Sequence, residues 1–95
     1  MNAPRPTALI AEDEPLLAQA LVSELARVWP ALRIVSTVGD GVSAVTQALV
    51  LRPDVLFFDI RMPGQSGLEA AAELADAWPS QGPPFPALVF VTAYD

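Results

Sequence analysis

Short apolar runs alternate along the chain with longer stretches in which apolar residues recur every three or four positions. The runs at 7–11, 32–38, 55–59 and 87–91 have the length and composition of β-strands. The stretches that follow the first three runs have helical spacing and extend to about Val28, Leu51 and Trp78. Four prolines and a glycine make residues 79–86 a loop. Strands that alternate with helices predict right-handed βαβ units and a parallel sheet.

The helical spacing also predicts which residues face the core. They are Leu17, Leu21, Leu25 and Val28 in the first helix, Val42, Val45 and Leu49 in the second, and Leu68, Ala71, Ala72, Ala75 and Trp78 in the third. Asp13 is expected to cap the first helix. Partial alternation places the second strand near a sheet edge, and the fourth is expected to be buried. Trp29 and Trp78 each precede a proline at a helix end, where we expect packing against the core; an aromatic binding surface is the alternative.

Polar side chains stand where three of the predicted strands end. Glu12 and Asp13 follow the first strand, Asp59 ends the third, and Thr92 follows the fourth. If the first and third strands are neighbours, their acids converge at the carboxyl edge of the sheet, where ligands usually bind. Carboxylates that lie close together repel one another unless a cation intervenes, and Mg²⁺ prefers oxygen ligands of this kind. The alternatives are acids placed favourably at a helix N-terminus, an aspartate that only ends a strand, and a threonine without a function.

Composition narrows the class of protein. A length of 95 residues allows one domain, and 53% hydrophobic against 17% charged residues is typical of a globular chain. A net charge of -6 argues against nucleic-acid phosphates and anionic membranes as partners. The absence of cysteine and histidine excludes disulfides, zinc sites and a histidine base. No run approaches the roughly 18 apolar residues of a membrane span, and residues 1–6 lack a signal-peptide core, so a cytoplasmic protein is expected.

These features together resemble the receiver domain of two-component response regulators. The matching residues are Glu12 and Asp13 after the first strand, Asp59 after the third, Met62, Pro63 and Gly67 in the following loop, and Thr92 and Ala93 after the fourth. The resemblance implies an α/β fold, a flavodoxin-like doubly wound parallel sheet with strand order 2-1-3-4. Residues 11–15 and 89–95 look most like receivers joined to LytTR-type DNA-binding domains.

The resemblance also implies a role for each matching residue. Asp59 would be the phosphoacceptor and would receive its phosphoryl group from a phosphohistidine on a sensor histidine kinase. Asp13 would bind Mg²⁺ directly, Glu12 directly or through water, and Arg61 through its backbone carbonyl. Thr92 would donate its hydroxyl to a phosphoryl oxygen, and Ala93 would leave room for the phosphate. We therefore expect a phosphorylated signalling module and not an enzyme.

The chain departs from the family's pattern after the fourth strand. A complete receiver has five strand–helix units, so residues 1–95 are expected to form a single partial domain that lacks the last helix, strand and helix. The family's phosphate-binding lysine falls in the missing part, and all five cations of this chain are arginine. Slow phosphorylation or none is therefore expected. The fourth strand would be an exposed apolar edge, which predicts self-association.

Two other functions compete with the signalling module. In the first, the acidic site is vestigial and self-association is the only activity of the fragment. In the second, the chain is a Mg²⁺-dependent phosphatase of the haloacid dehalogenase type, which also uses a strand-end aspartate as its nucleophile. That enzyme needs a second aspartate two residues later, where this chain has Arg61. The phosphatase therefore ranks last.

Overall fold

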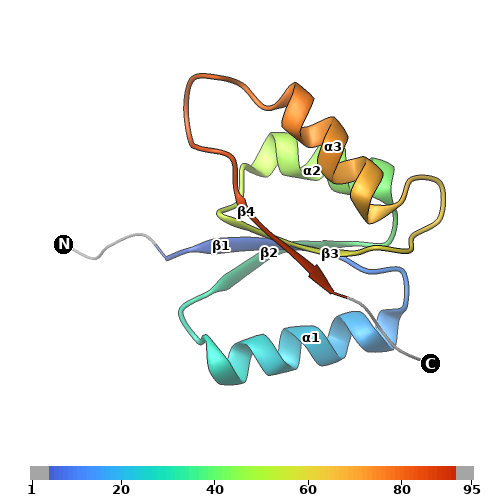
Figure 1. Cartoon of the computed structure of the whole chain (residues 1–95). Helices are drawn as coiled ribbons and strands as arrows, with labels where there is room; N and C mark the ends of the chain where they lie inside the picture. Colours follow the sequence, from blue (N-terminus) through green and yellow to red (C-terminus); the bar gives the residue numbers. More distant parts are fainter. Residues whose placement is uncertain (1–4, 92–95) are drawn as a thin grey trace.

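The computed structural model describes residues 5–91, which form seven elements in strict alternation (Figure 1). In chain order they are β1 (Thr7–Ala11), α1 (Pro15–Val28), β2 (Arg33–Val38), α2 (Gly41–Leu51), β3 (Val55–Asp59), α3 (Gly67–Ala77) and β4 (Ala87–Val91). The predicted elements are confirmed, with bounds that differ by one or two residues. No helix among the described residues is long and apolar enough to cross a membrane.

The four strands make one parallel sheet with the order β2-β1-β3-β4. This is the strand order predicted from the sequence, and the flavodoxin-like fold class is confirmed. Figure 1 shows α2 and α3 on one face of the sheet and α1 on the other. Because β1 and β3 are the inner strands, their side chains are covered on both faces, and all residues from Ala8 to Ala11 and from Val55 to Phe58 are buried.

Two hydrophobic clusters hold the layers together, one on each face of the sheet. The cluster beneath α2 and α3 consists of Leu9, Ala11, Ala44, Val45, Ala48, Leu56, Phe58, Ala70 and Leu74. The cluster beneath α1 consists of Ala8, Ile10, Leu32, Val55 and Phe57, with Leu21, Val22 and Leu25 packed against it. Neighbouring positions of one strand belong to opposite clusters, because successive side chains of a strand point to opposite faces.

The predicted core faces of the helices are partly wrong. Leu17, Val28, Val42 and Leu68 have exposed fractions of 43%, 60%, 62% and 54%, and Ala72 and Ala75 are also exposed. The buried helical positions are mostly small residues: Ala18 in α1, Gly41, Ala44, Val45 and Ala48 in α2, and Gly67, Ala70 and Leu74 in α3. Alanine and glycine let a helix approach the sheet closely, so the larger residues lie on the flanks of the contact.

The helix starts also differ from the prediction. The N-cap of α1 is Glu14, which makes no side-chain capping bond, so the prediction that Asp13 caps this helix is wrong. The helix α2 begins with a side-chain cap, because Asp40 accepts a 2.7 Å hydrogen bond from the backbone N–H of Ser43. The helix α3 begins with a capping box between Ser66 and Glu69. The Pro at the first turn of α1 is therefore its main start signal.

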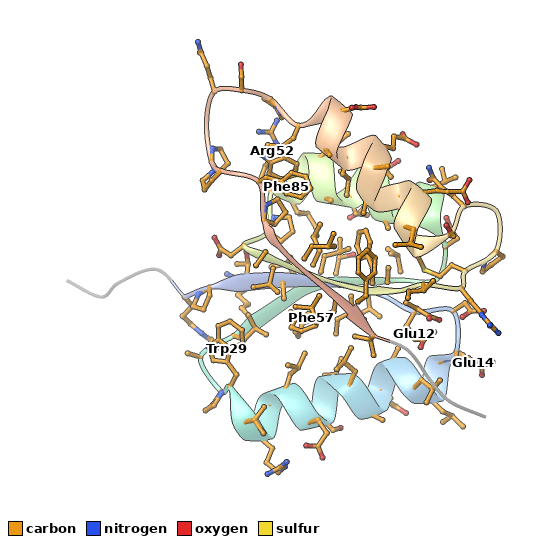
Figure 2. The ribbon with its side chains drawn as sticks, viewed as in Figure 1. Glu12, Glu14, Trp29, Arg52, Phe57 and Phe85 are labelled. Carbon is orange, nitrogen blue, oxygen red and sulfur yellow. The ribbon has the colours of Figure 1, made fainter. Side chains whose placement is uncertain are left out.

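The two tryptophans lie in different environments. Trp78 packs against the cluster beneath α2 and α3, as predicted. Its indole N–H donates to the carbonyl oxygen of Pro83 at 3.0 Å. Its ring meets the ring of Phe85 edge to face, with 5.5 Å between the ring centroids. The Arg52 guanidinium lies 5.4 Å from the same ring, and these side chains tie the 79–86 loop to α2 (Figure 2). Trp29 is 38% exposed, so the prediction that it packs in the core is wrong.

The strand β4 is an exposed apolar edge, as the departure from the family's pattern predicted, and the prediction of a buried strand from its composition is wrong. Among the described residues it pairs only with β3, and Val89 and Phe90 have exposed fractions of 41% and 37%. The strand carries no charged residue and no proline. The other edge strand, β2, begins with Arg33, and its pairing with β1 is irregular at Leu9. Only β2 therefore has features that discourage pairing with another chain.

Candidate functional site

The sheet register brings the acidic side chains together. Ala11 of β1 lies opposite Phe58 of β3 in parallel register, so the next residues along the two strands, Glu12 and Asp59, emerge side by side. One carboxylate oxygen from each of Glu12, Asp13 and Asp59 lies within 4.8 Å of the other two. The convergence expected from the sequence is therefore present at the carboxyl edge of the sheet.

The backbone holds these acids in place. The N–H of Glu12 donates to the carbonyl oxygen of Val38 at 2.9 Å, which extends the β1–β2 pairing by one residue beyond Ala11. The Glu12 carboxylate accepts a 3.3 Å bond from the N–H of Glu14, and the Asp59 carboxylate accepts one of the same length from the N–H of Arg61. Figure 2 shows Glu12 at the end of β1, with Glu14 beside the start of α1.

The pKa of Glu12 reflects the burial and the negative charge of the acidic cluster. Burial, together with a hydrogen bond and charge repulsion from Asp59, raises the pKa of the Glu12 carboxyl from 4.5 to about 7. The N–H of Glu14 opposes this rise only partly. At neutral pH a substantial fraction of Glu12 therefore keeps a proton that a glutamate in water would lose, and a divalent cation would compete with that proton.

A mostly apolar pocket lies beside the cluster. It has a volume of about 300 Å³ and lies between α1 and the β3–β4 side of the sheet. Its lining consists of Leu17, Ala20, Leu21, Phe57 and Val91, together with Ala11 and the acids Glu12, Glu24 and Asp59. Glu12 and Asp59 are only partly exposed, whereas Asp13 is exposed. The first two acids therefore interact through a less polar medium than bulk water.

The loop that follows Asp59 has a tightly defined backbone. The N–H of Gly67 donates to the carbonyl oxygen of Ile60 at 2.8 Å, and the N–H of Gln65 donates to that of Pro63 at 2.9 Å. The second bond closes a γ-turn around Gly64, whose φ of 77° suits glycine. A Cβ at Gly67 would clash with the carbonyl oxygen of Asp59, so α3 can start this close to β3 only with glycine there.

The predicted site residues divide into three groups. Glu12, Asp13 and Asp59 are brought together, and Arg61 lies exposed on the loop two residues beyond Asp59. Thr92 and Ala93 lie outside the described residues. The sequence prediction missed Gln65 and Gly41, which lie in contact near this loop. The Gly-Asp-Gly pattern before α2 was their only signal, and it indicated nothing more than a helix boundary.

Comparisons with known proteins agree with this geometry. A family model described as response regulator receiver domain matches residues 8–95. An uncharacterised response regulatory protein of Vibrio cholerae is 46% identical over 89 residues, which cover 94% of this chain and 32% of that protein. The positive alginate biosynthesis regulatory protein of Pseudomonas aeruginosa is 36% identical over 87 residues, covering 92% and 33%. The chain thus spans about a third of the length of these curated relatives.

Solved structures give the same result. The response regulator receiver domain from Methylobacillus flagellatus, described as CheY-like, superposes with a TM-score of 0.77 at 25% identity. The match covers 94% of this chain and 70% of that one.

Proposed function

The chain belongs to the response regulator receiver domain family, and on this premise we propose that it is a phosphoacceptor module of two-component signalling, with Asp59 as the phosphorylated residue. The observation that carries the proposal is the cluster of Glu12, Asp13 and Asp59, whose carboxylate oxygens lie within 4.8 Å of one another. Asp59 is the acid that the buried inner strand β3 delivers to the carboxyl edge of the sheet.

The donor set fits Mg²⁺. Three carboxylates supply hard oxygen ligands. The pKa of Glu12 is raised mainly by burial and also by Asp59, and a cation would relieve the repulsion from Asp59. Asp13 and Asp59 would bind the ion directly, Glu12 directly or through water, and the backbone carbonyl of Arg61 would complete the protein ligands. When bound, Mg²⁺ would neutralise charge on the phosphoryl oxygens.

In the proposed reaction an Asp59 carboxylate oxygen attacks the phosphorus of a phosphohistidine. An O–P bond forms as the P–N bond breaks, and the electron pair of that bond leaves with the imidazole nitrogen. The β3 strand, which ends at Asp59, fixes the position of the attacking carboxylate. We assign Thr92 as a hydroxyl donor to the phosphoryl group and Ala93 as the residue that leaves it room, on the resemblance alone.

The partners follow from the same proposal. The donor is a sensor histidine kinase, and the module itself binds neither nucleic acid nor a membrane, in keeping with its net charge of -6. Its location is the cytoplasm. The subclass we propose is that of receivers joined to LytTR-type DNA-binding domains, because residues 11–15 and 89–95 resemble that group.

The test is phosphorylation by acetyl phosphate with and without Mg²⁺, followed by intact mass measurement. Wild type should gain one phosphoryl group, slowly because the chain contains no lysine, and only when Mg²⁺ is present, whereas Asp59→Asn should gain none. Asp54→Asn is the matched control, because Asp54 precedes the same strand at its opposite end and bonds to Thr7. An adduct that persists in Asp59→Asn, or none in wild type with saturating Mg²⁺, would overturn the proposal.

The alternative function is a self-associating interaction module without phosphotransfer. The observation that favours it is the outer edge of β4, which no other strand of residues 5–91 pairs with, which is uncharged and which exposes Val89 and Phe90. Light scattering at high micromolar concentration should then show a dimer that Val89→Lys returns to a monomer. Thr37→Lys, on the exposed edge strand β2, is the control and should leave the dimer intact. A wild-type monomer contradicts self-association, whatever the outcome of the phosphorylation test.

A further inference from the structure

The turn before α2 lies between the two loops that carry the acidic cluster. On one side, the Cα of Gly39 faces the backbone of Glu12 and Asp13; a Cβ built there would lie 3.8 Å from the carbonyl oxygen of Glu12 and from the Cα of Asp13. On the other side, Gly41 abuts Gln65, in the loop between β3 and α3. Residues 39–41 therefore occupy the space between the loop that follows β1 and the loop that follows Asp59.

The contact on the Gln65 side leaves no room for a side chain. A Cβ at Gly41 would clash with the backbone carbonyl oxygen of Gln65 and would lie 2.7 Å from its Cβ. These are atoms of the backbone and its first side-chain carbon, so they cannot move away by a change of rotamer. The start of α2 is itself fixed, since the Asp40 carboxylate accepts bonds from the N–H and the hydroxyl of Ser43 at 2.7 and 2.9 Å.

The other side of the loop is held by α3. The side-chain amide of Gln65 donates to the Glu73 carboxylate at 2.7 Å, and the backbone of Gln65 closes the γ-turn around Gly64. The amide oxygen of Gln65 is buried without a hydrogen-bond partner among the described residues. The amide N–H bond to Glu73 is therefore the side-chain hydrogen bond that holds Gln65 in this conformation among the described residues.

We propose that Gly41, Gln65 and Glu73 are positioning residues for the acidic site: they fix the 60–66 loop at the distance from residues 12–13 that a shared Mg²⁺ requires. This inference rests on the proposed function, because it assumes that the cluster binds Mg²⁺. A side chain at position 41 would push the loop, and the Arg61 backbone with it, away from Glu12 and Asp13. Loss of the Gln65–Glu73 bond would leave the same loop free to shift.

The experiment is calorimetric titration of the chain with MgCl₂ alone, with each variant's fold checked by circular dichroism and thermal unfolding. Gly41→Ala should weaken Mg²⁺ binding by about tenfold or more, the usual cost of disturbing groups that orient metal ligands. Gly39→Ala is the matched control two residues away, where a Cβ makes only ordinary contacts, and its Mg²⁺ affinity should stay within about twofold of wild type.

A second pair of variants keeps the proposal testable if Gly41→Ala does not fold. Glu73→Ala removes the acceptor for Gln65 and should weaken Mg²⁺ binding several-fold. Glu73→Gln removes the same charge but keeps an oxygen that can accept the bond, so it should restore the wild-type affinity. Equal affinities in wild type, Gly41→Ala and Glu73→Ala would refute the positioning role while leaving the proposed function intact. Absence of Mg²⁺ binding in wild type would overturn both.

Discussion

The two aspartates at the ends of β3 should respond in opposite directions to the same substitution. Asp59→Asn removes a charge from the acidic cluster, so in the absence of metal it should raise the free energy of unfolding. Asp54→Asn instead weakens hydrogen bonds that stabilise the fold, because the Asp54 carboxylate accepts bonds from the N–H and the hydroxyl of Thr7 at 2.8 and 3.3 Å. That variant should lower the free energy of unfolding by about 1 kcal/mol.

The size of the Asp59→Asn effect follows from the geometry and the titration of Glu12. Two carboxylates at the upper limit of 4.8 Å repel by about 1 kcal/mol in bulk water and by about 3 kcal/mol at the lower effective dielectric of a protein surface. The rise in the Glu12 pKa from 4.5 to about 7 corresponds to at most about 3 kcal/mol. Burial is its largest cause and persists in the variant, and solvent screens the partly exposed carboxyls. We therefore expect a gain of about 1 kcal/mol.

The raised pKa of Glu12 also predicts how the stability gain in Asp59→Asn depends on pH. Because the folded-state pKa of Glu12 lies above its unfolded-state value, the folded chain holds more protons between about pH 4.5 and 7. The free energy of unfolding of wild type should therefore fall as the pH rises through this window. In Asp59→Asn the fall should be smaller, so the advantage of the variant should be largest at pH 8 and should nearly vanish below pH 5.

Urea unfolding followed by Trp fluorescence measures all three proteins in EDTA at pH 5 and pH 8. A gain of about 1 kcal/mol should also raise Tm by about 4–8 °C for a domain of this size. Adding MgCl₂ at pH 8 should stabilise wild type and Asp54→Asn, but not Asp59→Asn. The reasoning is refuted if Asp59→Asn is no more stable than wild type at pH 8 in EDTA.

Three further substitutions, two of them paired with a comparison variant, test the local structure that supports the site. Trp78→Ala should lower the free energy of unfolding by about 3 kcal/mol, because the ring packs on the core and anchors the 79–86 loop. Trp29→Ala should lower it by less than about 1 kcal/mol, because Trp29 is exposed. Equal losses for the two variants in urea unfolding would contradict this. Gly67→Ala should lower the free energy of unfolding by about 2 kcal/mol or more, because the new Cβ clashes with the last residue of β3. Gly64→Ala should lower it by only about 1 kcal/mol, because the space there is open and the only cost is a φ of 77°. Urea unfolding compares the two variants. Ser66→Ala removes the α3 capping box and should cost about 1 kcal/mol, measured by thermal unfolding; an unchanged Tm would show that the cap does not limit stability.

The strands and their order could be predicted because the local signals agree. Each strand is a short apolar run bounded by breakers or acids, and helical stretches of ten or more residues between runs require parallel crossovers. The helix faces could not be predicted equally well. In α1 Leu21 and Leu25 face the sheet as predicted, together with the small residue Ala18 and Val22. Leu17 instead lines the pocket beside the acidic cluster and is 43% exposed. A count of large apolar residues overlooks small ones that permit close approach.

The site likewise has one part that the sequence could predict and one part that it could not. Glu12 and Asp59 could be predicted as neighbours because strand ends and strand order are enough to place them. The contact between Gly41 and Gln65 could not, because it joins the start of α2 to a loop 24 residues later in the chain. Its tightness depends on how closely α2 approaches that loop, and no local pattern in the sequence encodes that distance.

The remaining question is whether the acids after β1 serve the site or only the helix that follows them. If they served the helix, one of them should cap α1 or lie in its first turn. The N-cap of α1, Glu14, makes no side-chain capping bond, and the first turn contains no acid. Glu12 makes one 3.3 Å bond to the N–H of Glu14, yet its pKa is still raised to about 7. The N–H of Glu14 lowers that pKa, but burial and Asp59 raise it by more, so the helix start does not by itself stabilise a charged Glu12. In our proposal a cation shared with Asp59 supplies that stabilisation.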